Sequence, residues 1–321
     1  MEPFLPSGET DREVLYMETY LLGPTLELLS RPAGPDEGTL TLLTSEELSH
    51  TLSLPGLETV LPHTPPARDA RVCKAEMRGD CLCRTVFTPR KTKDGQPIAF
   101  GYLLTGRHMV LCDDCGAARS LIAHLSKEKH WQENGPGRVF YELLELLIVK
   151  DHHHLEEMED RLSQLEDEIL SGALDRFSAP ITALRNEAMN WYRYHSQLGD
   201  MACELEEDES GFFSEHERRL FHLVVKRLGR LRDEDQLLRE YCLQVRELFQ
   251  AQVDIRQNRI MQILTVVTTL CLPLSLVAGW YGMNFVGMPE LGWKYGYPAV
   301  IAVSVLIVVI SLWIMKKKKF W

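Results

Sequence analysis

The chain has 321 residues, and its 45% hydrophobic and 25% charged content excludes a disordered or collagen-like protein. Its 35 Lys and Arg residues against 46 Asp and Glu residues give a net charge of −11. A nucleic-acid partner is therefore not expected, because a nucleic-acid binder needs a basic face to neutralise phosphate. The length is sufficient for about two structural units, each with its own core.

Residues 1–138 predict an α/β domain built on a sheet. Segments beginning at Ser45 and at Gly116 are typical of short helices that pack on such a sheet. The strands are expected in short, partly alternating runs that are rich in strand formers and bounded by turn signals. These runs are Thr39–Leu43, Thr85–Thr88, Pro97–Thr105 and His108–Cys112.

The eight cysteines of the chain raise the question of metal binding. In a reducing compartment a disulfide framework is not the default interpretation. Two close pairs, Cys81 with Cys83 and Cys112 with Cys115, supply four thiolates, which can close a tetrahedral zinc site. The spacing departs from the common zinc patterns, so it favours the alternative of ordinary reduced cysteines at strand ends and turns.

Residues 139–258 predict a helical region and stalk. Apolar residues recur three and four positions apart from Val139 onward, and a second helix is expected over Ile181–Glu206. The acidic residues of these helices are typical of a solvated face, and the alternative is that they concentrate divalent cations near a pore. The tetrapeptide Asp151–His154 carries metal-ligating side chains, but adjacent positions on a helix point in different directions, which favours a solvated surface.

A third helix begins near Ser214, where Ser214 and Glu217 form a capping-box pattern. Its apolar stripe continues into an uncharged segment, so one helix is expected from Ser214 to Tyr281. At 1.5 Å per residue this helix would be about 100 Å long. It cannot be stable alone, and we expect it to pack against helices of its own chain and of identical subunits.

Two uncharged runs, Ile260–Pro289 and Tyr295–Met315, are each long enough to cross a bilayer as a helix, which takes about 20 residues. The first 20 residues of the chain lack the features of a signal peptide. Arginines precede the first run and four lysines follow the second, so the positive-inside rule places both termini in the cytoplasm. Residues 259–321 therefore predict a two-helix transmembrane domain. The alternative, a buried helix of a soluble protein, is disfavoured by the length of the runs.

Gly-Met-Asn stands at residues 282–284, near the end of the first run, and Met-Pro-Glu-Leu follows at residues 288–291. Pro-Leu-Ser at residues 273–275 and the C-terminal lysines complete the pattern. With these motifs the sequence resembles the CorA family of divalent-cation (magnesium) channels, most closely over residues 258–321. The fold implied is an α+β membrane protein, in which a cytoplasmic α/β domain carries a very long stalk helix that continues into the first of two C-terminal transmembrane helices.

The resemblance implies a homopentameric pore with a selectivity filter at Gly282, Met283 and Asn284. A ring of Asn284 oxygens would hydrogen-bond hydrated Mg²⁺, and the alternative is that Asn284 only ends the helix. One face of the first span would line the pore, with an apolar gate near its inner end, although such stripes also serve helix packing. The pore-lining positions implied are Asn258, Met261, Leu264, Thr268, Leu272, Ser275 and Gly279.

Charged residues flank the implied pore on both sides. In the outer loop, Glu290 and Lys294 would attract and position the hydrated cation. At the inner mouth a basic collar is implied, whose alternative role is to fix topology and bind anionic lipid. The collar consists of Lys316, Lys317, Lys318 and Lys319.

The sequence therefore predicts a passive Mg²⁺ influx channel in the plasma membrane, whose partners are identical subunits, divalent cations and the lipid bilayer. In the family, Mg²⁺ also regulates the channel. Two alternatives stay open. One is a Zn²⁺, Co²⁺ or Ni²⁺ transporter of the same superfamily, favoured only if the cysteine pairs or His152–His154 bind metal. The other is a membrane-anchored metal sensor. A structural Zn²⁺ at the cysteines is a separate alternative. An enzyme is not expected, because the sequence lacks a phosphate loop and the Gly-x-Ser-x-Gly and His-Glu-x-x-His motifs.

Overall fold

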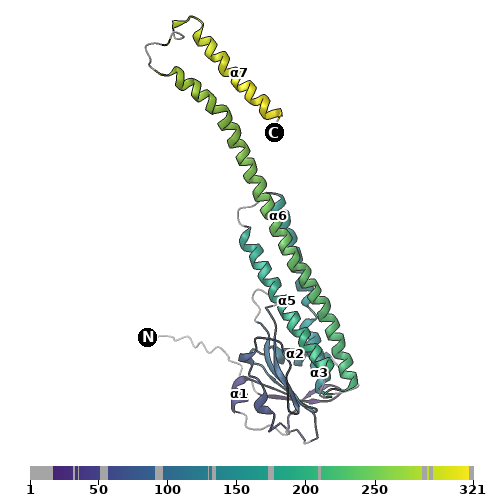
Figure 1. Cartoon of the computed structure of the whole chain (residues 1–321). Coiled ribbons are helices and arrows are strands. Elements are labelled where there is room, and N and C mark those ends of the chain that lie inside the picture. The colour runs from purple at the N-terminus through teal and green to yellow at the C-terminus, as the bar shows by residue number, and fades with distance from the viewer. Residues whose placement is uncertain are drawn as a thin grey trace, which may run out of the picture. The chain divides into compact units, whose positions relative to one another are not determined.

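The computed structural model describes most of the chain (Figure 1). The described residues are 17–31, 33–34, 36–50, 57–90, 97–128, 130–131, 135–172, 177–208, 211–283, 288 and 292–317. They form two compact units, the first within residues 1–165 and 178–244 and the second within residues 166–177 and 245–321.

A mixed sheet forms the centre of the first unit. In the described part of the chain it has seven strands in the order β2-β1-β3-β7-β6-β5-β4. Strands β3 and β7 pair in parallel, with Thr39 opposite His108 and Leu43 opposite Cys112, and the other neighbours are antiparallel. The strands are β1 (Glu18–Leu22), β2 (Leu26–Leu28), β3 (Thr39–Leu43), β4 (Met77–Arg78), β5 (Cys81–Phe87), β6 (Ala99–Leu104) and β7 (His108–Cys112).

Short helices lie between the strands, and longer ones follow the sheet in sequence. The short ones are α1 (Ser45–His50) and the 3₁₀ helices η1 (Leu61–His63) and η2 (Ala67–Asp69). The longer ones are α2 (Ala117–Glu128), α3 (Pro136–Ile148), α4 (Asp151–Leu170), α5 (Ser178–Glu207), α6 (Glu215–Tyr281) and α7 (Gly296–Lys317).

The two faces of the sheet bury different cores because successive side chains of a strand point to opposite sides. In β7, Met109 and Leu111 belong to the large core that also includes buried residues of α2 to α6. The alternate residues Val110 and Cys112 belong to a smaller core with Leu61 of η1. Helices therefore cover one face, and the short segments around η1 and η2 cover the other.

The predicted fold class is confirmed, and the differences in detail have local causes. The four predicted strands and the two short helices are present, with β5 beginning at Cys81 rather than Thr85. Strands β1, β2 and β4 were not expected, because β2 and β4 have only three and two residues and β1 carries a charged residue at its start. Their strand pairing comes from neighbours that are distant in sequence, which a local pattern does not contain.

The start of α6 follows the predicted capping box. The Ser214 backbone N–H donates to Glu217 Oε2 at 2.9 Å, and the Glu217 backbone N–H donates to Ser214 Oγ at 3.2 Å. Two donors that the first helical turn leaves without a backbone partner are thereby satisfied. From this cap the helix runs for 67 residues without interruption, as the sequence predicts.

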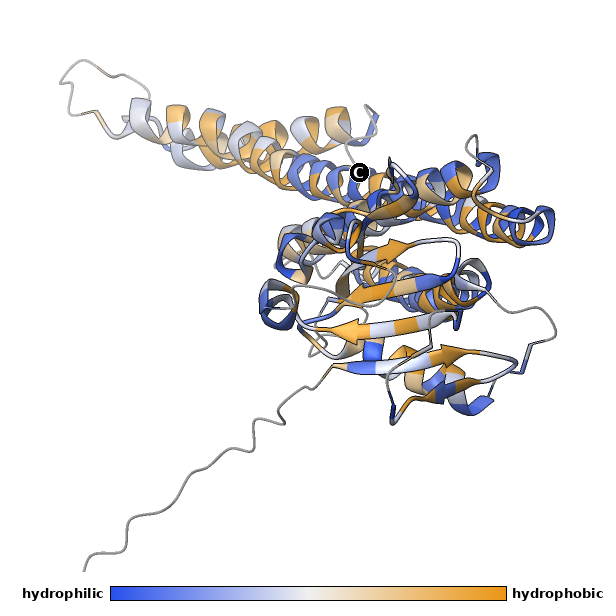
Figure 2. Ribbon diagram, turned by 90° about the horizontal axis from the view of Figure 1, so that it is seen from below, coloured by the Kyte–Doolittle hydropathy of each residue, from blue (hydrophilic) through white to orange (hydrophobic). Residues whose placement is uncertain are grey.

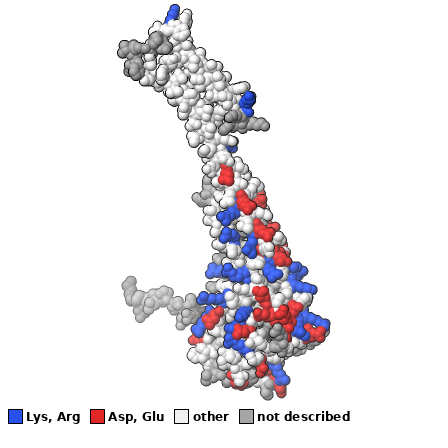
Figure 3. Space-filling model, in the orientation of Figure 1, with Lys and Arg blue, Asp and Glu red and all other residues white. Residues whose placement is uncertain are grey.

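The second unit consists of the end of α4, the later part of α6, and α7. Phe177 stacks on Phe249 with ring centroids 5.2 Å apart. Helices α6 and α7 each contain a segment long and apolar enough to cross a membrane. These segments are mostly orange in Figure 2, and on the face drawn in Figure 3 they carry almost no charged side chains.

One glycine of the sheet is required by a close backbone approach. A Cβ on Gly101 in β6 would overlap the carbonyl oxygen of Pro65. We expect Gly101→Ala to destabilise the first unit by about 1–3 kcal/mol, because neither backbone segment can yield without disturbing the sheet. Thermal unfolding of the full chain in detergent measures this loss.

Gly229→Ala in α6 is the matched control. A Cβ on Gly229 would meet no atom within 4 Å, and alanine has the higher helix propensity. This variant should unfold at the same temperature as the parent or slightly above it. Equal destabilisation by both substitutions would show that the approach of Pro65 does not constrain position 101.

Candidate functional site

The seven implied pore-lining residues of α6, from Asn258 to Gly279, are all exposed. Within the same segment a second set of residues is half-buried, namely Val266, Leu270, Pro273, Leu274 and Val277. At about 100° of rotation per residue, the centres of the two sets are about 180° apart around the helix axis. The implied pore-lining residues, which we call the uncovered stripe, therefore lie opposite the face that is packed.

Helix α7 covers the packed face of α6. It runs back beside the end of α6 (Figures 1 and 2), and its own buried and partly buried positions recur three and four residues apart, as on one face of a helix. These positions are Gly296, Ala299, Val300, Ser304, Ile307, Val308, Ser311 and Met315. Each of the two helices thus uses one stripe for contact within the chain, and in α6 the opposite stripe stays open.

Large apolar and small polar side chains share the uncovered stripe. Met261, Leu264 and Leu272 are 54%, 55% and 70% exposed, values that are costly for apolar groups unless lipid or another protein surface covers them. Between them, the Thr268 hydroxyl lies 2.9 Å from the backbone oxygen of Leu264 and donates its proton within the helix. Its oxygen lone pairs remain available as acceptors for the water molecules of a hydrated cation.

Helix α6 ends where the Gly-Met-Asn motif begins. The Gly282 backbone N–H donates to the oxygen of Ala278 at 2.9 Å, and that of Met283 donates to the oxygen of Trp280 at 3.4 Å. The last carbonyls of a helix carry the negative end of its dipole, which favours a nearby cation. Gly282 and Met283 are exposed there, whereas Asn284 lies outside the described residues.

The flanking charges are described only in part. Lys294, Lys316 and Lys317 are exposed, and the Lys317 ammonium lies 5.2 Å from the centre of the Trp313 ring. A lysine beside an aromatic ring is typical of the end of a membrane-spanning helix. Glu290, Lys318 and Lys319 lie outside the described residues.

The cysteines of the sheet are buried. Cys81, Cys83 and Cys112 belong to the small core on the η1 side of the sheet, while Cys115 is exposed. Burial raises the pKa of Cys83 to about 11, so its thiol stays protonated at neutral pH. Within the described ranges, no group of three or more His, Cys, Asp or Glu side chains is placed to hold a metal ion. The structure therefore gives the zinc interpretation no support.

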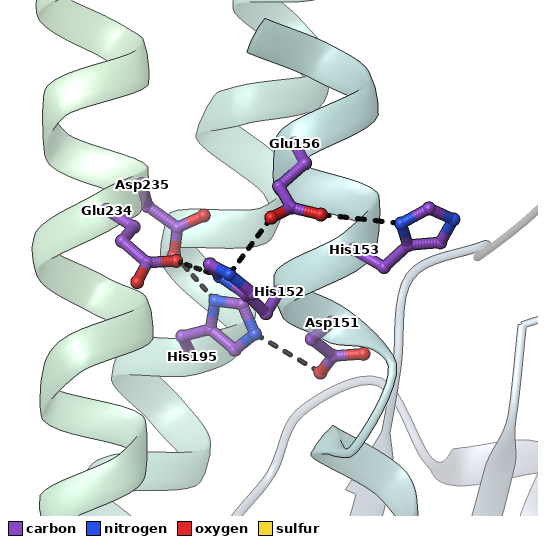
Figure 4. A network of polar contacts seen from close by, with 7 residues as sticks. All are labelled: Asp151, His152, His153, Glu156, His195, Glu234 and Asp235. Carbon is purple, nitrogen blue, oxygen red and sulfur yellow. Dashed lines mark hydrogen bonds and ion pairs between the residues drawn. The ribbon is translucent and has the colours of Figure 1, made fainter.

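Three fully buried titratable side chains join α4, α5 and α6 (Figure 4). The His195 ring lies between two carboxylates, with Nδ1 2.6 Å from Asp235 Oδ2 and Nε2 3.2 Å from Asp151 Oδ2. Because both ring nitrogens face acceptors, the imidazolium form fits this geometry. Burial alone lowers the pKa of His195, but hydrogen bonds and charges from Asp151 and Asp235 outweigh burial and raise it.

This network was not predicted, although the sequence contains a signal for it. Asp235 occupies the position between Leu231 and Leu238 in the apolar stripe of α6, and His195 occupies the corresponding position between Trp191 and Leu198 of α5. A polar residue on a core stripe needs a buried partner. The sequence pattern shows that each of these polar residues requires a buried partner, but only the tertiary structure shows which residues contact each other.

The histidines beside this network have carboxylate partners of their own. His152 is 62% exposed and contacts Glu234 at 2.9 Å and Glu156 at 3.2 Å (Figure 4). The predicted solvated surface is correct for His152, and for its neighbour His153, which is 75% exposed. It is wrong for Asp151, which is 0% exposed because its side chain turns inward to His195, and for His154, which is 12% exposed and lies beside Glu187.

Comparisons with known proteins agree with this architecture. Residues 107–317 match the family model described as CorA-like Mg²⁺ transporter protein. The cobalt/magnesium transport protein CorA of Thermotoga maritima is 29% identical over 182 residues, which are 57% of this chain and 52% of that protein. The magnesium transport protein CorA of Wolinella succinogenes is 42% identical over 76 residues, 24% of each chain. The match therefore spans about half of the first relative and a quarter of the second.

The solved structures extend the likeness to almost the whole chain. The complete structure of the CorA magnesium transporter from Methanocaldococcus jannaschii matches with a TM-score of 0.79 and 21% sequence identity. The match covers 94% of this chain and 98% of that chain. At this level of identity the likeness establishes the fold, including the long helix and the two C-terminal helices.

The buried network generates a prediction about stability. Replacing His195 by Gln leaves two buried carboxylates without their shared cation, which should lower the free energy of unfolding by about 3–5 kcal/mol at pH 6. The pKa of His195 is raised in the folded state, so its contribution is complete below about pH 6.5 and is lost as the pH rises through the raised value. Unfolding of the full chain in detergent at pH 6 and pH 9 should therefore show a smaller difference at pH 9.

His152→Gln is the control for this prediction. His152 also lies between two carboxylates, but it is exposed, so its ion pairs contribute little. Its variant should unfold like the parent at both pH values. The same loss in both variants, or a difference that does not change with pH, would contradict the account of the buried network.

Proposed function

The chain belongs to the CorA-like Mg²⁺ transporter family, and from this membership we propose that it is a passive channel for divalent cations, with Mg²⁺ as its main substrate. The observation that carries the proposal is the uncovered stripe of α6. It combines hydroxyl and small residues with apolar ones on the face opposite the packed one, and it leads to the Gly-Met-Asn motif. A membrane-anchored sensor would need no such stripe.

Several identical chains are needed to turn this stripe into a pore. A single helix cannot enclose water, and α7 covers the opposite side of α6. A ring of chains would turn the uncovered stripes toward a common axis. Met261 and Leu264 would then face this axis and would contact water only when the pore is filled with water. The resemblance to the family gives five chains, and the lipid bilayer would then cover the outer surface.

Selection in this pore would act on the hydrated ion. Mg²⁺ loses its water reluctantly and requires octahedral geometry, so oxygen acceptors that bind its water molecules are more suitable than a dehydrating cage. One Asn284 side chain per subunit provides a ring of such acceptors without a fixed charge. The Thr268 hydroxyl, whose proton is donated within the helix, would act in the same way further along the stripe.

An apolar constriction would close the pore. Met261 and Leu264 stand at the inner end of the uncovered stripe, and a narrow ring of apolar side chains expels water. The driving force for uptake would be the membrane potential, which is worth about 4.6 kcal/mol for a divalent cation at 100 mV. No nucleotide hydrolysis is required. Both termini would lie in the cytoplasm, and the membrane would be the plasma membrane.

Transport of Mg²⁺ into proteoliposomes tests the proposal. Purified chain reconstituted in vesicles with an imposed negative-inside potential should take up Mg²⁺, and Asn284→Ala should abolish at least nine-tenths of this uptake, because the filter loses its ring of acceptors. Zn²⁺, Co²⁺ and Ni²⁺ are tested separately to establish the preferred ion.

Leu306→Ala serves as the control for this experiment. Leu306 is 57% exposed on α7 and lies away from the stripe by which α7 contacts α6. It should retain the uptake of the parent. If neither Mg²⁺ nor the other ions move, or if Asn284→Ala conducts as well as the parent, the channel proposal fails and the anchored sensor becomes the better account.

A further inference from the structure

A cavity of about 910 Å³ in the first unit has no part in the proposed pore. Its walls come from the end of β5, the segment before β6, and helices α4 and α5. The volume is within the range of small-molecule sites, about 300–1,000 Å³. Four arginines line it, namely Arg71, Arg90, Arg161 and Arg193.

One of these arginines is neutralised by the wall itself. Arg161 Nη1 lies 3.0 Å from Glu187 Oε2, and His154 Nε2 lies 3.3 Å from Glu187 Oε1. The hydrogen bond from His154 and the charge of Arg161 hold the pKa of Glu187 below its usual range. The second carboxylate of the wall, Glu157, lies 3.4 Å from His153. Both acidic side chains of the cavity therefore already have a basic partner within the wall or beside it.

The other three arginines have no ion-pair partner among the residues that the structure describes. Arg71 follows η2, Arg90 follows β5 and Arg193 belongs to α5, so separate segments bring three guanidinium groups to one cavity. All three are exposed to solvent, so their guanidinium groups are accessible to a ligand in the cavity. The planar guanidinium group binds phosphate or carboxylate through two parallel hydrogen bonds, so three of them at one cavity suit an anionic ligand.

The rest of the lining indicates more than a simple anion. Asn186, Asn190 and Gln197 follow one another with Arg193 at steps of three and four residues, so they share one face of α5. Their amides are both donors and acceptors, as pairing with the edge of a heterocyclic base requires. The half-buried ring of Phe87 adds a flat apolar surface. An inorganic phosphate would use only the arginines and leave this part of the cavity without a function.

We propose that this cavity binds a nucleotide, with Arg71, Arg90 and Arg193 on its phosphate groups and the amide face of α5 on its base. The site is distinct from the uncovered stripe of α6 and does not depend on the transport proposal. Because its walls join the sheet to helices α4 and α5, an occupant would stabilise the first unit by mass action.

Titration calorimetry of the full chain in detergent tests this proposal. The probes are ADP, adenosine and inorganic phosphate, all with EDTA, so that Mg²⁺ neither bridges nor competes. ADP should bind, and adenosine and phosphate should each bind at least tenfold more weakly. Arg193→Gln and Arg71→Gln should each weaken ADP binding about tenfold or more, which corresponds to about 1.4 kcal/mol. An unchanged thermal unfolding midpoint shows that each variant is folded.

Arg185→Gln is the matched control, since it makes the same change of charge on the same helix, outside the cavity. It should bind ADP like the parent. The proposal is overturned if ADP does not bind at millimolar concentration or if phosphate binds as tightly as ADP. It is also overturned if Arg193→Gln and Arg185→Gln weaken ADP binding equally. Dissociation of the oligomer by Arg193→Gln with ADP binding unchanged would also overturn it, and would assign the arginines to a neighbouring chain. Ion flux is not part of the readout, so failure here leaves the channel proposal unaffected.

Discussion

Helix α6 passes through two environments on one unbroken backbone, and this constraint determines the role of most other elements. In the first unit its apolar stripe packs with α4 and α5 around Phe221 and Leu228. Beyond Arg259 it carries no charged residue up to its end at Tyr281. In lipid an α-helix forms its backbone hydrogen bonds internally, but its side-chain faces still have to be covered. Helix α7 covers one face, and the proposal assigns the opposite one to a water-filled axis shared by identical chains.

The buried network of Asp151, His195 and Asp235 involves the part of α6 that belongs to the first unit. An apolar stripe alone allows neighbouring helices to slide by a turn, since leucines fit many partners. Here the imidazole of α5 must contact a carboxylate of α6 and a carboxylate of α4 at the same time. One register of the three helices satisfies both contacts. Such a network adds little net stability compared with apolar residues, but breaking it is costly. We interpret it as the device that fixes the position of α6 relative to its neighbours in the first unit.

Sequence patterns predicted what depends on local periodicity and on motifs. The cap at Ser214, the single helix to Tyr281 and the strands around His108–Cys112 follow from residue spacing and turn chemistry. The strands β2 and β4 and the meeting of His195 with Asp151 and Asp235 depend on contacts between distant segments, which no local pattern specifies. The filter residue Asn284 lies outside the described residues, so its role stays a prediction that rests on the family motif and on the exposed stripe below it.

The most direct test of the account is the reactivity of the two faces of α6 during conduction. In a background with Cys115→Ser, Cys203→Ser and Cys271→Ser, in which the remaining cysteines are buried, one cysteine is introduced on the uncovered stripe at Thr268 or Ser275, or on the packed face at Leu270 or Val277. A charged thiol reagent in water should block Mg²⁺ flux through the first two variants and leave the other two unaffected. Block through the packed face, or equal block through both, would contradict the claim that the uncovered stripe of α6 lines the ion path.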